Sequence, residues 1–293
     1  ASEEGATLEI PFVYTEPAIS TEQLTQEMFG TVLHEVSSVY VNNANRTKNL
    51  ELACAAINGT ILNPGDTFSF NDIVGERTAE KGYKPATVYV TGGASDSQLG
   101  GGICQVASTM YYGTLHLMNV EQVQREPHMY AVTYVPMGMD AAIYWDMKQD
   151  YKFKNTGNHP MKIETWLEDG KVQVRYLGVK DWEETVKMTY QTLATYPWAE
   201  VEEVDETKEP GFKEVKTTPY TGYKVEAFRT VYDKDGKEIS KTSVVSSYKK
   251  RDKVWTVGPA VEEEPPFWEE NPDVILPDDE EEDENDYIFD YWD

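Results

Sequence analysis

The stretch GGGICQVASTMYYGTLHLM, residues 100–118, decides the fold. Three glycines precede a cysteine, and Val106, Met110 and Leu117 then recur at helical spacing. We therefore expect a helix that begins at Cys104 and buries one face in a core. Glycine lets the backbone approach closely at such a helix start, and the helix N-terminus stabilises a thiolate through its dipole and free N–H groups.

Upstream of this helix, the pattern predicts a second helix over about residues 47–58, whose apolar face carries Cys54. Ser20 followed by Gln23 has the form of a capping box, which predicts a short helix after Ser20. Strands are expected at 31–36, 67–70 and 86–90, with a polar loop through Asp96 and Ser97 before the glycines.

Downstream of the helix, four strand candidates follow at about 120–126, 131–135, 142–146 and 150–155. A hairpin comes next, because two alternating runs, 162–166 and 172–176, are joined by a Glu-Asp-Gly turn. Helices followed by runs of strands predict an α+β fold.

The character of the chain changes near residue 181. Residues 181–261 are rich in Thr, Val and Tyr and have few helical signals, so we expect an elongated all-β module with a hairpin turn at 233–236. The predicted domains are therefore 1–180, 181–261 and an acidic, aromatic-bearing tail at 262–293.

The charge of the chain is concentrated in that tail. The 293 residues carry a net charge of -26, and residues 262–293 contain 16 acidic and no basic side chains, leaving 36 acidic and 26 basic residues in 1–261. A chain this acidic repels phosphate backbones and anionic lipid, which argues against nucleic acid as a partner. No stretch approaches the roughly 18–20 apolar residues of a transmembrane helix.

Candidate catalytic residues follow from Cys104. A nucleophilic cysteine needs a base and a group that orients the base, and the next polar candidates are His128 and Asp140, with Asp150 as the alternative orienter. Cysteine at a helix start, then histidine and aspartate on successive strands, is the order of transglutaminase-like and papain-like cores. The histidines show no metal-ligand spacing, and we expect neither a metal nor a cofactor.

Other interpretations of Cys104 stay open. A cysteine in a helix is most often a small buried hydrophobe, and the structural interpretation is favoured over catalysis. The two cysteines, Cys54 and Cys104, permit a disulfide, and Gln105 beside Cys104 raises an internal thioester.

A set of motifs between residues 46 and 178 resembles the VanW-like family. They are Arg46 with Asn49 and Leu50, Asn58-Gly59-Thr60, the run 64–71, Val74-Gly75, Gly82-Tyr83, the run 100–106, Arg125 with Pro127-His128, the run 134–136 with Gly138, Asp140-Ala141, and Asp150 with Phe153 and Asn155. Residues 181–260 resemble the G5 module, through the run 219–225, Asp235-Gly236-Lys237 and Val257-Gly258.

The resemblance implies an extracytoplasmic protein, secreted or on the surface of a mostly Gram-positive bacterium and linked to its cell envelope. The start at Ala1 rather than Met is what a mature form would show. The family has no settled activity, and the G5 resemblance implies cell-wall and N-acetylglucosamine-containing partners.

Two main functional hypotheses follow. The preferred one is a surface binding or assembly protein, whose acidic aromatic tail docks on a partner or on a neighbouring copy. The alternative is an envelope enzyme in which Cys104, His128 and Asp140 hydrolyse or transfer amides of peptidoglycan stem peptides or surface proteins. A third hypothesis is carbohydrate recognition by aromatics of the β module, including Trp198, Tyr220, Tyr223 and Trp255.

Overall fold

The structure is a computed structural model that describes residues 19–89 and 95–260. The predicted acidic tail, and the tail docking that depends on it, lie outside the described residues. Contacts divide the described residues into two compact units, of which the first holds residues 19–89, 95–201 and 215–255 and the second holds 202–214 and 256–260. These units group the strands differently from the predicted boundaries, because most of the β module belongs to the first unit.

The first unit begins with helices and strands close to those predicted. The capping box of Ser20 and Gln23 is present at the start of α1. The helices are α1 (Thr21–Phe29), α2 (Ala44–Ile57), α3 (Phe70–Val74) and α4 (Cys104–Thr114), and the strands up to the hairpin are β1 (Thr31–Val39), β2 (Ile61–Leu62), β3 (Thr67–Ser69), β4 (Pro85–Tyr89), β5 (Ser95–Leu99), β6 (Val120–Gln124), β7 (Lys152–Asn155), β8 (Met161–Glu168) and β9 (Lys171–Gly178).

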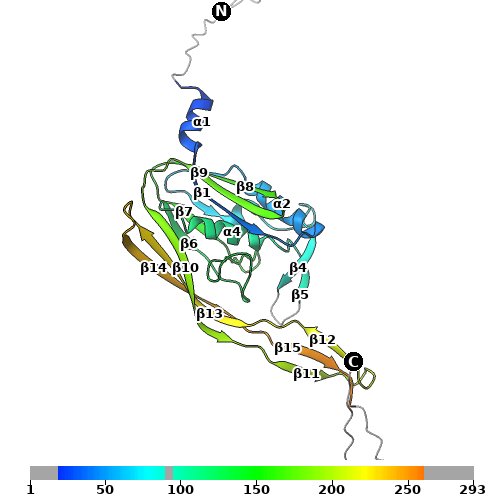
Figure 1. Cartoon of the computed structure of the whole chain (residues 1–293). Helices are drawn as coiled ribbons and strands as arrows, with labels where there is room; N and C mark the ends of the chain where they lie inside the picture. The colour runs from blue at the N-terminus through cyan, green and yellow to red at the C-terminus, as the bar shows by residue number, and fades with distance from the viewer. Residues whose placement is uncertain (1–18, 90–94, 261–293) are drawn as a thin grey trace, which may run out of the picture. The chain divides into compact units, whose positions relative to one another are not determined.

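Two antiparallel sheets support α4. One has the strand order β1-β9-β8-β2 and the other β3-β7-β6. Helix α4 packs against β1 and β9, and α2 packs against β8 (Figure 1). The predicted hairpin is confirmed as β8 and β9, whose alternate side chains face the core.

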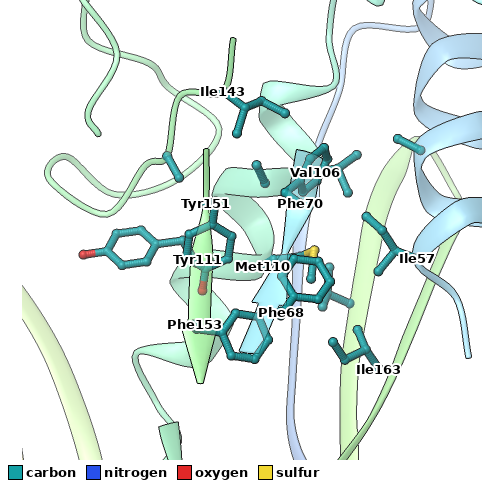
Figure 2. Close-up of a cluster of buried hydrophobic side chains, with 14 of the residues drawn as sticks. Ile57, Phe68, Phe70, Val106, Met110, Tyr111, Ile143, Tyr151, Phe153 and Ile163 are labelled. Carbon is teal, nitrogen blue, oxygen red and sulfur yellow. The ribbon is translucent and has the colours of Figure 1, made fainter. Parts of the chain in front are cut away.

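The core lies between α4, α2 and the strands. Phe68 of β3 and Phe153 of β7 stack with ring centroids 4.9 Å apart, and Met110 of α4 is fully buried beside them (Figure 2). Ile57 of α2 and Ile163 of β8 close the other side of this cluster. The helix that begins at Cys104 is thus anchored along its length by buried apolar side chains.

The prediction of strands at 131–135 and 142–146 was wrong. Within 125–151 the described backbone forms loops with two isolated bridges, Glu126–Ala142 and Tyr144–Gln149. Proline at 127 and 136 removes backbone donors, and side-chain hydrogen bonds, described below, take the place of a ladder. The predicted polar loop through Asp96 and Ser97 was also wrong, since these residues belong to β5, which pairs with β4.

The β module contributes a three-stranded sheet to the first unit, with the order β10-β13-β14. These strands are β10 (Thr185–Tyr196), β13 (Gly222–Tyr232) and β14 (Glu238–Tyr248), and the predicted turn at 233–236 joins the last two. Arg229 of β13 donates to the carbonyls of Leu115 and Leu117 just beyond α4, at 2.8 and 2.9 Å. This sheet is therefore joined to the helix that carries Cys104.

The remaining strands are β11 (Glu200–Val204), β12 (Lys213–Thr217) and β15 (Lys253–Val257), in the order β11-β15-β12. Within the second unit, Asp205 N–H donates to the Val257 carbonyl and Gly258 N–H to the Phe212 carbonyl, at 2.8 and 2.9 Å.

Candidate active site

Cys104 is the first residue of α4, as predicted, and it is partly exposed. The preceding turn has Gly100 and Gly102 at φ 78° and 108°, a backbone region that favours glycine. Its Sγ lies 3.4 Å from the carbonyl oxygen of Ile143, and Cys104 lines the same cavity as His128, whose ring is near enough to lower the pKa of the thiol. The structure therefore brings the candidate nucleophile and the candidate base to one cavity.

His128 lies in the loop after β6 rather than on a strand. Its Nδ1 is 2.6 Å from Oδ2 of Asp140, and its backbone N–H donates to the same oxygen at 2.8 Å. A carboxylate can only accept, so Nδ1 carries the proton and Nε2 remains for Cys104. The Tyr134 hydroxyl lies 3.2 Å from Nε2. These contacts hold both the orientation and the tautomer of the ring.

Asp140 is fully buried and is the centre of the network. Its Oδ1 accepts from Arg125 Nη2 at 3.0 Å and from the Tyr248 hydroxyl at 2.5 Å. Arg125 also donates to the Gly138 carbonyl and to Ser246 Oγ of β14, at 3.1 and 2.8 Å. The orienting carboxylate is therefore held by the loop and by β14 together.

The three site residues shift each other's pKa values in the directions that favour an ion pair. Burial raises the pKa of the Cys104 thiol, but its hydrogen bond to His128 and the charge of that ring outweigh burial and leave the pKa below its ordinary value. Burial lowers the pKa of His128, yet its hydrogen bonds to Asp140 and Cys104 raise that pKa to about 9. These shifts favour a thiolate beside an imidazolium.

The carboxylate completes the same electrostatic arrangement. Burial raises the pKa of Asp140, but the hydrogen bond and charge of His128, together with the Arg125 charge, lower it to about 2. Asp140 is thus ionised throughout the ordinary pH range.

Asp150, the alternative orienter, is not part of this network. Its carboxylate accepts from Ser69 Oγ at 2.7 Å and from the backbone N–H of Asn71 and Tyr151 at 2.9 and 2.8 Å. It therefore fixes the start of α3 and does not orient His128.

The disulfide and thioester interpretations do not match the structure. Cys54 and Cys104 are both free, and burial raises the pKa of Cys54 to about 12. The Gln105 side chain is engaged elsewhere: its Nε2 donates to Ser38 Oγ and to the Val39 carbonyl, at 3.0 and 2.8 Å, and its Oε1 accepts from Arg46.

A cavity of about 930 Å³ opens at Cys104. His128, Tyr134, Arg46 and Arg77 are among the residues that line it. This volume is in the usual range for small-molecule and cofactor sites. Among the described residues, no group of three or more His, Cys, Asp or Glu side chains is placed to hold a metal ion.

Sequence reasoning missed several residues of the site. Tyr248 is 108 positions from Asp140, and nothing in the local pattern of β14 distinguishes it from a core tyrosine. Arg125 was noted as a motif residue without a role. Tyr220, from the proposed carbohydrate-binding aromatics, instead stacks on Tyr130 with ring centroids 5.2 Å apart.

Comparisons with known proteins find relatives of the part of the chain that carries Cys104, His128 and Asp140. The family model described as VanW like protein matches residues 45–177, which confirms the predicted VanW-like domain. The protein YoaR of Bacillus subtilis (strain 168), named as uncharacterized, is 36% identical over 156 residues, covering 53% of this chain and 50% of YoaR. The vancomycin B-type resistance protein VanW of Enterococcus faecalis (strain ATCC 700802 / V583) is 29% identical over 146 residues, covering 47% of this chain and 51% of that protein.

The chain thus spans about half the length of the curated relatives it matches.

Two solved G5 domains also match. The IgA1 protease G5 domain covers 27% of this chain and 94% of its own, with 19% identity and a TM-score of 0.21. The G5 domain of HP0197 covers 26% and 97%, with 18% identity and a TM-score of 0.16. In the part of the chain that is described, no helix is long and apolar enough to cross a bilayer.

Proposed function

We propose that this chain, with its VanW-like domain at residues 45–177, is a cysteine-dependent acyl-transfer enzyme of the bacterial cell envelope. The observation that carries the proposal is that Cys104 and His128 line one cavity, while Oδ2 of Asp140 lies 2.6 Å from Nδ1 of the His128 ring. Three residues that are 12 and 24 positions apart meet in the order of a nucleophile, a base and an orienting carboxylate.

The proposed reaction uses these groups in two steps. The Cys104 thiolate attacks the carbonyl carbon of an amide, a C–S bond forms, the C–N bond breaks, and His128 gives its Nε2 proton to the departing amine. Water or a second amine then attacks the thioester carbon, so a C–O or C–N bond forms, the C–S bond breaks and the Cys104 thiolate is released, while His128 takes the proton of the attacking group. Asp140 keeps Nδ1 protonated and stabilises the imidazolium. Water yields hydrolysis and an amine yields transpeptidation.

The substrates that we propose are amides of peptidoglycan stem peptides, with surface-protein amides as the alternative. Support for an extracytoplasmic, envelope location comes from the VanW-like domain and from the relative in Enterococcus faecalis, whose name ties that relative to vancomycin resistance. The binding or assembly hypothesis, which the sequence alone preferred, stays a prediction because the tail at 262–293 lies outside the described residues.

The proposal is tested by trapping the thioester. Soluble muropeptides are incubated with the protein, the reaction is quenched in acid, and intact mass and peptide mapping follow. We expect a mass increase that maps to the peptide containing Cys104, and the Cys54→Ala variant should show the same adduct because Cys54 is 3% exposed and away from the cavity lining. Finding neither an adduct nor any cleaved muropeptide or surface polypeptide would contradict the proposal.

A further inference from the structure

The guanidinium of Arg77 has no hydrogen-bond partner among the described residues. Its Nε, Nη1 and Nη2 atoms are all buried and unpaired, and its recorded ring contacts are to Phe70 and Trp145, each 5.9 Å from the ring centroid. A guanidinium carries five N–H donors in a planar fork. A buried donor without an acceptor destabilises the fold, so the arrangement suits a ligand that supplies acceptor oxygens.

A second arginine lies in the same cavity and is also incompletely paired. Arg46 donates from Nη2 to Oε1 of Gln105 at 3.1 Å, while its buried Nε has no partner among the described residues. Arg46, Arg77 and Cys104 all line the cavity of about 930 Å³. The charge of Arg77 also contributes to lowering the pKa of the Cys104 thiol, which places the two groups in the same electrostatic neighbourhood.

The glycine run explains how both arginines come to lie beside the cysteine. A Cβ at Gly100 would lie 2.9 Å from Cγ of Arg77, and a Cβ at Gly102 would lie 2.9 Å from Cγ of Arg46. Side chains at these positions would displace the two arginine stems. The glycines before Cys104 therefore leave room for the side chains of Arg77 and Arg46 beside the N-terminus of α4.

The acidic residues of the cavity do not neutralise these arginines. Glu76, Glu126 and Asp146 also line it, but they are exposed, and no ion pair joins any of them to Arg46 or Arg77 in the described part of the chain. Asp150 acts on Arg77 only through its charge, because its carboxylate accepts from Ser69 and backbone N–H groups and pairs with Lys152 at 3.6 Å. The cavity therefore keeps its own cationic donors for a ligand.

We propose that Arg77 and Arg46 form a carboxylate-binding subsite of the Cys104 site, so that the substrate is an acyl compound with a carboxylate close to its scissile amide. This inference rests on the proposed function. A carboxylate matches the fork of a guanidinium with two parallel N–H···O bonds, and an amide or hydroxyl at the same place cannot. The carboxylate is either the free C-terminus of a peptide or an acidic side chain.

The subsite is tested by binding rather than by turnover, using the Cys104→Ala variant of the full chain. Three probes are titrated by isothermal calorimetry or NMR: N-acetyl-Ala-Ala with a free C-terminal carboxylate, its C-terminal amide, and N-acetyl-Glu with an amidated C-terminus. We expect at least one carboxylate probe to bind 10-fold or more tightly than the neutral amide. The two carboxylate probes distinguish a C-terminal from a side-chain source.

Substitutions then show which side chains cause the preference for the carboxylate probes over the neutral amide probe. Arg77→Gln should remove the discrimination, Arg77→Lys should keep only part of it, and Arg46→Gln should weaken it. Lys249→Gln is the matched control, because Lys249 is an exposed cation at the same cavity; it should leave the discrimination unchanged if the arginine donors, rather than the general positive charge, bind the ligand.

Equal binding of all three probes, or a carboxylate preference that survives Arg77→Gln, would overturn the subsite. The acyl-transfer proposal and the carboxylate subsite are contradicted by different results. Carboxylate binding without any Cys104 adduct in the wild-type chain would contradict the acyl-transfer proposal alone, whereas an adduct formed equally from neutral and acidic peptides would contradict the subsite alone.

Discussion

Replacing Cys104 with alanine is expected to abolish acyl transfer while changing the free energy of unfolding by less than about 1 kcal/mol. The residue is partly exposed, and its thiol is the proposed nucleophile in the cavity that His128 also lines. Cys54 cannot replace it, because Cys54 is buried and its pKa is raised to about 12. The measurement is peptide release from soluble muropeptides by chromatography and mass spectrometry, with urea unfolding for stability.

Two further variants sharpen this prediction. Cys104→Ser keeps a hydrogen-bonding group of similar size but loses the low-pKa thiolate, so it should be as inactive as the alanine variant. Cys54→Ala should keep activity, at the cost of a small core cavity. A Cys104→Ala protein that releases peptide at the wild-type rate would show that the cysteine is structural.

Replacing Asp140 with asparagine is expected to lower the rate of acyl transfer about 10²- to 10⁴-fold. An amide cannot serve as the anionic acceptor that the His128 Nδ1–H and Arg125 both require. The imidazolium loses its counter-charge, and the tautomer that presents Nε2 to Cys104 is no longer enforced. The measurement is kcat/KM for the same muropeptide, taken where circular dichroism shows both proteins folded.

Asp140→Asn also carries a stability cost, and a second variant separates the two effects. The Arg125 side chain is 7% exposed, and removing the partner of a buried charge costs about 3–5 kcal/mol. Tyr248→Phe keeps the Asp140–Arg125 pair but leaves the Gly138 N–H, which donates to the Tyr248 hydroxyl at 2.8 Å, without its acceptor.

Tyr248→Phe should therefore lose about 1–3 kcal/mol of stability with a much smaller rate loss than Asp140→Asn. A folded Asp140→Asn protein with the wild-type rate would show that Asp140 only pairs with Arg125.

The sequence pattern predicted the helix and its cysteine because both depend on local signals. Spacing of apolar residues places Val106 and Met110 on the buried face, and the glycines mark the helix start. The hairpin of β8 and β9 was equally clear, since its alternation and its turn agree. Order along the chain then pointed to His128 and Asp140 as candidates, and the structure places these two side chains 2.6 Å apart.

The pattern of apolar and polar residues could not predict the conformation of loops that are held by side-chain hydrogen bonds. The segment 125–151 contains Val and Tyr, which favour strands, but Arg125 and Asp140 supply its hydrogen bonds instead of a ladder. The Tyr248 contact spans 108 positions, and the unpaired state of Arg77 appears only after the chain is folded. Such contacts depend on tertiary packing, which periodicity does not encode.

The most direct test of the account is the pH dependence of Cys104 alkylation by iodoacetamide, followed by mass spectrometry of the peptide that contains it. Because His128 lowers the thiol pKa, the account predicts half-maximal alkylation at a lower pH than for an ordinary cysteine thiol measured under the same conditions. A second change is expected near pH 9, where His128 loses its proton. His128→Ala should raise the midpoint, since the largest effects that oppose burial are then lost and the charge of Arg77 remains, and Cys54 should stay unlabelled. A wild-type midpoint at or above the ordinary value, unchanged by His128→Ala, would contradict an activated cysteine at this site.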